Sequence, residues 1–255
     1  MWANTARRLS QCTRGKQDKY FDMIERYTKL SREHLTPELQ LHLLTPDCPL
    51  YTARADQVES HFAEPFWAIY WPGGQAMARY LLDEGTQLFA KIRAKNAAAN
   101  SGALKVLDVG SGCGAAAIAA KFAGANDVIA NDIDQVACAA ALLNARVNGV
   151  EIKTCPTDLF SQGRALAERF DVLLIGDLLY DEAIADLLLP WLEANQRKHG
   201  SEIYIADPGR HGMKEKLRRR LQLCRKYPLP ENVRRENHGF TEAAVWKFNQ
   251  APKGI

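Results

Sequence analysis

The chain has 255 residues, of which 47% are apolar and 25% are charged. This is the composition of an ordinary globular protein, and the length is sufficient for one large domain with its own core. A net charge of +3 is too small to indicate a nucleic-acid partner by itself. No stretch approaches the roughly 18 apolar residues of a membrane-spanning helix, so we expect a soluble protein without a membrane partner.

The six cysteines and six histidines are scattered along the sequence. They show neither C-x-x-C nor H-x-x-x-H spacing, so a zinc site has little support and we expect no metal. We expect the cysteines to be small buried side chains in a reducing compartment.

The first 17 residues are basic and contain no acidic residue. Their basic residues are Arg7, Arg8, Arg14 and Lys16. The segment lacks the apolar core of a secretory signal and is similar to a mitochondrial transit peptide, although a frayed basic terminus would have the same composition. We therefore expect a basic N-terminal segment over 1–34 that includes a helix. The expected location is the mitochondrial matrix, or the cytoplasm if the source is bacterial.

The next part of the chain alternates between helical and loop patterns. Helical periodicity covers residues 18–46, where Thr36 and Pro37 are suited to begin a helix. The aromatic run FWAIYWPGG at 66–74 is typical of a strand, and a helix over 75–84 follows it. We expect residues 35–255 to form one domain, with a helical extension over 35–65.

From residue 105 onward, strands and helices alternate. The expected strands are 105–110, 127–134, 201–208 and 243–249. Residues 151–160 are expected to be a strand and loop, and 171–181 a buried strand that runs into a loop. The expected helices are 115–124, 135–149, 182–200 and 213–227. This alternation predicts an α/β fold with a mostly parallel sheet, right-handed crossovers and helices on both faces. The last two strands are suited to form an antiparallel hairpin at the sheet edge.

The sequence LDVGSGCGA at 107–115 lies between a predicted strand and a helix, where a cofactor loop belongs. Its glycines allow the backbone to turn tightly and to approach a ligand. The candidate loop residues are Gly110, Ser111, Gly112 and Gly114. The spacing also fits the looser nicotinamide-dinucleotide fingerprint, but Asp108 would repel a pyrophosphate. A carboxylate at that position suits the ammonium group of S-adenosylmethionine, which has no phosphate.

Two further acids follow predicted strands. Asp132 is suited to accept hydrogen bonds from a ribose diol, and Asp158 to meet an adenine amino group. Together with Asp108 and the glycine loop, these acids resemble the pattern of the Rossmann-like, seven-strand S-adenosylmethionine methyltransferases. A structural turn with solvated acids and an NAD enzyme are the alternatives.

The fourth strand of the alternating part ends in GDLLYDE, at 176–182. Methyltransferases of bases and glutamine usually carry Asn/Asp-Pro-Pro-Tyr there, and Leu178-Leu179 in place of the prolines argues against a planar nitrogen target. Asp177-x-x-Tyr180 resembles the D/E-x-x-Y/F motif of seven-strand protein lysine methyltransferases. A lysine amine has a reference pKa of about 10.4 and must lose a proton before it attacks.

That chemistry assigns a role to each residue of the motif. Asp177 is expected to be a positioning acceptor rather than a strong base, and Tyr180 a wall and second hydrogen-bond partner. The plainer interpretations are a helix cap for Asp177 and a core aromatic for Tyr180.

Longer blocks extend the resemblance. FWAIYWPGGQAMARYLLDEG, GSGCGA, ANDID, GDLLYDE and ADPGR are similar, in this order, to the lysine methyltransferases of the electron transfer flavoprotein β subunit. The likeness covers roughly residues 35–250. It implies methylation of lysines in the flavoprotein's recognition loop, with Trp71 beside the cofactor and the backbone of Gly176 facing the adenosine. WPGG is also consistent with a simple packed turn.

Two other functions stay open at this stage. One is methylation of another protein, such as a ribosomal protein, or of RNA, because 213–227 is markedly basic. Few aromatic residues interleave with these charges, which makes nucleic acid a weak candidate. The other is a non-catalytic module that binds a client protein. We expect a monomer.

Overall fold

A computed structural model describes residues 14–48, 51, 65–96, 103–161, 163–237 and 239–249. Residues 1–13, on which most of the predicted transit segment falls, lie outside these ranges, as do residues 52–64 of the expected helical extension. In the described part of the chain, no helix is both long enough and apolar enough to cross a bilayer.

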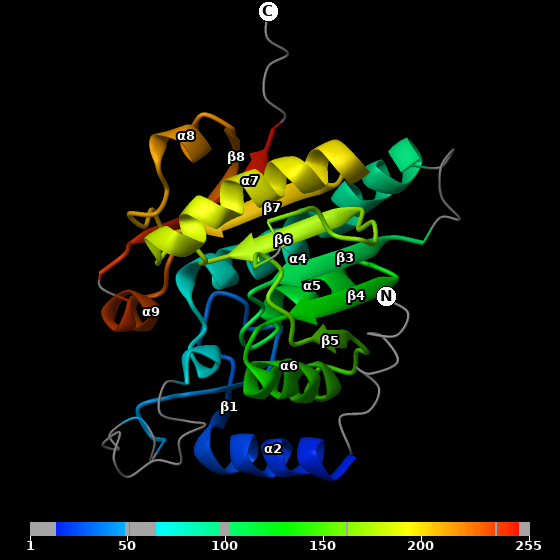
Figure 1. Ribbon diagram of the computed structural model, residues 1–255. Coiled ribbons are helices and arrows are strands. Elements are labelled where there is room, and N and C mark those ends of the chain that lie inside the picture. Colours follow the sequence, from blue (N-terminus) through cyan, green and yellow to red (C-terminus); the bar gives the residue numbers. More distant parts are fainter. Residues whose placement is uncertain are drawn as a thin grey trace, which may run out of the picture.

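A seven-stranded sheet with the order β5-β4-β3-β6-β7-β9-β8 forms the centre of the fold (Figure 1). The strands are β3 (Lys105–Val109), β4 (Asp127–Asn131), β5 (Lys153–Cys155), β6 (Val172–Gly176), β7 (Glu202–Asp207), β8 (Leu221–Pro228) and β9 (Glu242–Phe248). The first five run parallel, and β9 pairs antiparallel with both β7 and β8. The predicted α/β class, parallel sheet and antiparallel edge are confirmed.

The central strands are buried on both faces, which explains their nearly continuous apolar sequences. Successive side chains point to opposite faces. Val106 and Leu174 belong to the cluster beneath α4 (Pro72–Asn96) and α5 (Ala115–Phe122). Leu107 and Leu173 belong to the cluster beneath α7 (Glu182–His199).

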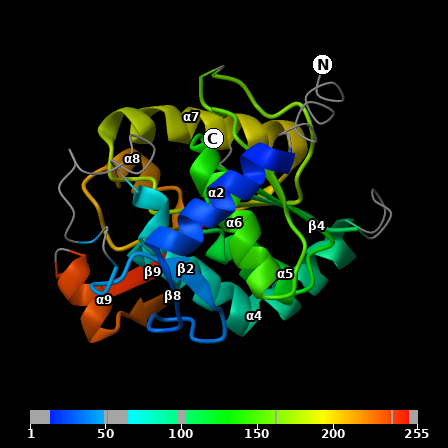
Figure 2. The ribbon, with the colours of Figure 1, turned by 90° about the horizontal axis from the view of Figure 1, so that it is seen from below.

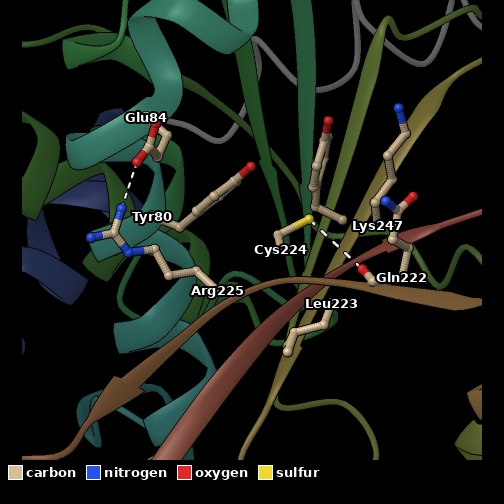
Figure 3. A pocket seen from close by; sticks show the side chains of 8 residues that line it. Tyr80, Glu84, Gln222, Leu223, Cys224, Arg225 and Lys247 are labelled. Carbon is tan, nitrogen blue, oxygen red and sulfur yellow. Dashed lines mark hydrogen bonds and ion pairs between the residues drawn. The ribbon is translucent and has the colours of Figure 1, made fainter.

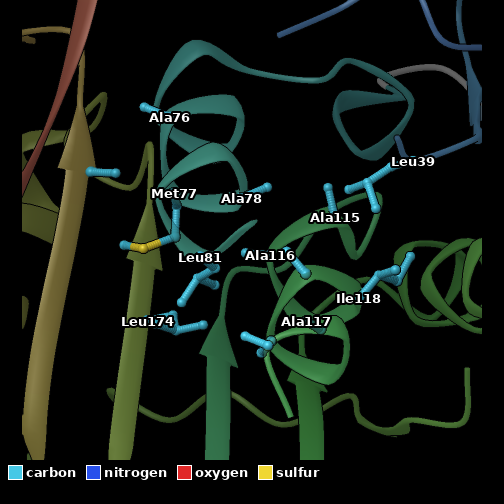
Figure 4. Packing of buried hydrophobic residues seen from close by; sticks show 14 of the residues in the cluster. Leu39, Ala76, Met77, Ala78, Leu81, Ala115, Ala116, Ala117, Ile118 and Leu174 are labelled. Atoms are coloured by element: carbon cyan, nitrogen blue, oxygen red, sulfur yellow. The ribbon is translucent and has the colours of Figure 1, made fainter. Parts of the chain in front are cut away.

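Small side chains of α5 allow α4 to pack close beside it. The alanines at the start of α5 meet Met77 and Leu81 of α4 and Leu174 of β6 in one core cluster (Figure 4). A Cβ on Gly85 of α4 would lie only 2.6 Å from the Ala123 Cβ. This close contact holds α4 beside α5, and α4 lies over strands β6, β7 and β9.

The N-terminal part adds α2 (Arg14–Tyr27) and the antiparallel pair β1 (Lys29–Ser31) and β2 (Leu41–Leu43). α2 packs against α6 (Gln135–Val147), as seen from below in Figure 2. The expected helix over 18–46 is therefore wrong beyond Tyr27. Asn144 of α6 and Asn148, which follows its last residue, accept hydrogen bonds from the backbone of His42 and Gln40, at 2.7 and 2.9 Å. These tertiary contacts override the local helical pattern.

Two other expected elements are also wrong. The aromatic run at 66–74 is not a strand: it holds the 3-10 helix η3 (Phe66–Ala68), and α4 begins at Pro72, which suits a first helical position. The basic stretch 213–227 is not one helix, because only α8 (Glu215–Arg218) is helical before β8. Pairing of β8 with β9 determines its extended form, and its charges face solvent at the sheet edge. A short helix, α9 (Glu231–Glu236), then leads to β9.

Candidate active site

The candidate residues lie at the carboxyl ends of β3, β4 and β6. β3 pairs with β4 on one side and with β6 on the other, so the chain order reverses beside β3. In open α/β sheets this point leaves a crevice in which ligands bind. The predicted cofactor loop 110–114 follows β3, and the predicted acceptor motif 177–180 follows β6.

The loop between β3 and α5 requires glycine for two different reasons. Gly114, which precedes the first residue of α5, has a φ of 80°, and a Cβ there would lie 2.7 Å from the Ala141 Cβ. Gly110 has a φ of 67°, and a Cβ there would lie 2.5 Å from Cδ2 of Leu178. The loop is thereby packed between α6 and the segment that follows β6.

Asp108 lies beneath this loop with 3% of its surface exposed. Its Oδ2 accepts a hydrogen bond of 3.1 Å from the backbone N–H of Ala117, in the first turn of α5. Burial raises the pKa of Asp108 to about 7, and the neighbouring charge of Asp132 adds to the effect. A buried carboxyl group of this kind is well suited to pair with a ligand cation.

Asp132 connects the end of β4 to the same loop. Its Oδ2 accepts a hydrogen bond from Gly112 N at 3.0 Å, and its Oδ1 accepts one from Asp134 N at 3.0 Å. Burial raises the pKa of Asp132. The Oγ of Ser111 is buried and has no hydrogen-bond partner among the described residues. The loop therefore offers an unpaired polar atom and two carboxylates, and these groups fit an amino-acid nucleoside.

Asp158 is arranged differently from the other two acids. It is exposed, and its Oδ1 accepts hydrogen bonds from the backbone of Phe160 and Ser161, at 2.9 and 3.1 Å. Its hydrogen bonds thus remain within its own turn after β5. The structure brings Asp108 and Asp132 to one loop, but it shows no such link for Asp158.

Asp177 is buried and has a φ of 57°, which is rare for a residue other than glycine. Its Oδ2 accepts a hydrogen bond from Gly73 N, and its Oδ1 accepts one from Nε of Arg210. Its own N–H donates to the Ala206 carbonyl at 3.0 Å. Burial raises the pKa of Asp177, and the Arg210 charge opposes that rise. The helix-cap interpretation does not hold, because Asp181 caps α7.

Tyr180 is 54% exposed, so it is not a core aromatic. Partial burial raises the pKa of its hydroxyl, and the charges of Asp181 and Asp132 raise it further, whereas Arg210 lowers it. Tyr180 lies three residues after Asp177, in the segment that joins β6 to α7.

Arg210 is the functional candidate that the sequence reasoning missed. Its guanidinium carbon lies 5.5 Å from the ring centroid of Trp71, whose Nε1 donates to the Phe66 carbonyl at 2.9 Å. Gly176 lies against the first turn of α4 near Trp71, because a Cβ there would lie 3.1 Å from Gly74 Cα. The motif ADPGR carried the signal for Arg210, but nothing in the sequence pairs it with Asp177.

A separate hollow of about 480 Å³ opens between α4 and strands β7, β9 and β8 (Figure 3). Its lining includes Tyr80 and Glu84 of α4, and Glu84 forms an ion pair of 2.5 Å with Arg225. Tyr204 lines it from the middle of β7. The hollow is thus away from the carboxyl ends of the strands.

Comparison with known proteins gives both family and structural matches. A family model described as ribosomal protein L11 methyltransferase (PrmA) matches residues 87–201. The electron transfer flavoprotein beta subunit lysine methyltransferase of Danio rerio is 39% identical over 249 residues, which are 97% of this chain and 90% of that protein. The protein of the same name from Mus musculus is 41% identical over 246 residues, 95% of this chain and 88% of that protein. A solved structure, magnesium protoporphyrin IX methyltransferase from Synechocystis with bound SAM, is 16% identical at a TM-score of 0.45, covering 81% of this chain and 100% of that chain.

Proposed function

Because this chain belongs to the family of electron transfer flavoprotein beta subunit lysine methyltransferases, we propose that it transfers methyl groups from S-adenosylmethionine to lysines of that subunit. The observation that most supports this is that a cofactor half and an acceptor half of one site lie at the same edge of the sheet. The buried Asp108 beneath the glycine loop forms the cofactor half. Asp177-x-x-Tyr180, which follows the neighbouring strand, forms the acceptor half. The match to the L11 methyltransferase model is confined to residues 87–201, which gives a ribosomal target less support.

The cofactor half suits an amino-acid nucleoside. Asp108, with its raised pKa, would pair with the ammonium group of the ligand. The unpaired Oγ of Ser111 would form a hydrogen bond to the amino-acid part of the same ligand. Asp132 would accept from the ribose hydroxyls with the lone pairs that Gly112 and Asp134 leave free. S-adenosylmethionine, when bound, supplies an electrophilic methyl group on a sulfonium.

The residues around this half complete the proposed cofactor site. Trp71 would form a wall, the backbone of Gly176 would face the adenosine, and Asp158 would approach the adenine amino group from its exposed turn. These three assignments follow from the family resemblance and from the position of each residue after η3, in β6 and after β5.

The acceptor half must orient a lysine amine and leave it neutral. Tyr180 is exposed in the segment that follows β6, so its ring and hydroxyl would line the path of the lysine side chain. The Asp177 carboxylate would act as an orienting acceptor, because burial and its existing partners fix its position. Proximity and alignment of this kind account for much of the rate of a group transfer.

The test is transfer of labelled methyl from S-adenosylmethionine to purified electron transfer flavoprotein β subunit, with mass spectrometry to locate the product. We expect label on lysines, and a loss of about 10²-fold or more in rate for Tyr180→Ala. Leu187→Ala is the matched control, since Leu187 is 50% exposed on α7. Absence of label on this subunit, with cofactor binding intact by calorimetry, would reject the substrate.

A further inference from the structure

Arg210 connects three segments that are far apart in the sequence. Its Nε donates to Oδ1 of Asp177, and its guanidinium carbon lies 5.5 Å from the ring centroids of both Trp71 and Phe240. The Arg210 side chain is only 12% exposed. A largely covered arginine with an ion pair and two aromatic neighbours is held in one orientation.

The turn after β7 fixes the backbone of Arg210. Oδ1 of Asp207 accepts hydrogen bonds from the backbone N–H groups of Gly209 and Arg210, both at 2.6 Å. Gly209 has a φ of 100°, a conformation that favours glycine. The motif ADPGR is therefore a turn that presents the arginine to the end of β6.

Asp177 is fixed just as firmly from its own side. Its backbone N–H donates to the Ala206 carbonyl, which fixes the main chain. Its Oδ2 accepts from Gly73 N, so the carboxylate cannot turn away from Arg210 without losing that hydrogen bond. The Asp177 and Arg210 charges therefore act on the acceptor half as a pair.

The net charge of the Asp177–Arg210 pair affects whether the acceptor lysine is protonated. An isolated carboxylate beside a lysine would favour the ammonium form, which cannot attack a methyl group. A carboxylate that is paired with a guanidinium still offers oxygen lone pairs, but it carries no net charge with its partner. The neutral pair thus orients an amine without trapping it as a cation.

We propose that Arg210 is a positioning residue of the methyl-transfer site, which cancels the charge of Asp177 so that the acceptor lysine is held as a neutral amine. This inference rests on the proposed function. The other charged or titratable groups facing the pair are Asp207, whose buried Oδ2 has no partner among the described residues, and Tyr180, which Asp132 also influences.

The test compares Arg210→Gln with Arg220→Gln. Arg220 is a matched control because it is also 12% exposed, pairs with Glu193 and lies 4.6 Å from the Phe248 ring, all away from the site. Single-turnover rates with the flavoprotein subunit are measured from pH 6 to pH 10. We expect the rising limb of the Arg210→Gln profile to move about one pH unit or more to the alkaline side, with about a tenfold lower rate at pH 7. Arg220→Gln should keep the wild-type midpoint.

Two further variants separate charge from structure. Arg210→Lys should keep much of the wild-type midpoint, because the positive charge remains. Asp177→Asn combined with Arg210→Gln should bring the midpoint back toward that of the wild type, because the pair is again neutral. Equal losses in Arg210→Gln and Arg220→Gln with unchanged midpoints would overturn the proposal and leave Arg210 a purely structural residue.

A measurement without substrate distinguishes a failure of this inference from a failure of the proposed function. The carboxyl carbon of Asp177, followed by ¹³C NMR, should titrate at a higher pH in Arg210→Gln than in the wild type, because Arg210 opposes the effect of burial. An unchanged titration would overturn the charge-cancelling role. If the wild type did not methylate the subunit, the substrate would be rejected while this titration still decided the role of Arg210.

Discussion

Asp108 is a deeply buried acid that forms no ion pair with a described residue. Among the described residues, its one side-chain hydrogen bond is from the Ala117 N–H, and its pKa is raised to about 7. A raised pKa of an acid means that ionisation opposes folding. The ligand-free protein therefore loses stability as the pH rises from about 4 to about 7, and a bound cation would restore it.

The affinity for S-adenosylmethionine should accordingly depend on pH. Below about pH 7 the carboxyl group must first ionise, so affinity should fall, approaching tenfold per pH unit. Above about pH 8 the α-amino group of the ligand loses its proton, so affinity should fall again. Calorimetry from pH 5.5 to 9 measures this profile.

Asp108→Asn serves as the control for that profile. It should lack the acidic limb, bind more weakly at pH 7.5 and be more stable than the wild type without ligand at pH 8. A variant that kept the wild-type acidic limb would show that another group, such as Asp132, controls binding.

At the level of elements, the start of α4 is packed directly onto the ends of β6 and β7. A Cβ on Gly73 would overlap the Ala206 carbonyl oxygen and lie 2.8 Å from Asp177 N. A Cβ on the next residue, Gly74, would meet nothing nearer than the Tyr70 ring at 3.6 Å. Two adjacent glycines in one helix thus have different constraints.

This difference predicts opposite effects of the same substitution. Gly73→Ala should lower the free energy of unfolding by about 1–3 kcal/mol through overpacking, and should lower methylation because it displaces Asp177. Gly74→Ala should be neutral or stabilise by up to about 1 kcal/mol, because alanine favours a helix. Urea denaturation of both variants measures this. Similar losses in the two variants would contradict the proposed close packing.

The elements also show what the sequence can predict. The buried strands and the helices from 105 to 207 are predictable because apolar runs of strand length alternate there with segments of helical periodicity. The stretches 29–43 and 221–228 are not predictable in this way, since the side chains of Asn144 and Asn148 and pairing with β9 determine their conformation. Likewise, Asp108 and Asp132 follow from their positions at strand ends, whereas the Asp177–Arg210 pair depends on β6 and β7 being neighbours.

At the scale of the whole molecule, the site draws on residues from Trp71 to Arg210, so a ligand there should stabilise the entire domain. S-adenosylmethionine at 100 times its dissociation constant should add about 2.7 kcal/mol. For a domain of this size that corresponds to a rise in Tm of roughly 5–10 °C. Differential scanning fluorimetry measures the shift, and Asp108→Asn at the same ligand concentration should show a smaller one. An unchanged Tm in the wild type would contradict the cofactor assignment.

The sheet order has a consequence for the growing chain. β9 lies between β7 and β8, although it is made last of the three. Until residues 242–248 leave the ribosome, β8 has no partner and β7 presents an open edge, because both strands pair with β9. A nonsense mutation shortly before Glu242 would therefore remove β8 and β9 from the sheet, and would leave β7 as an open edge that favours aggregation.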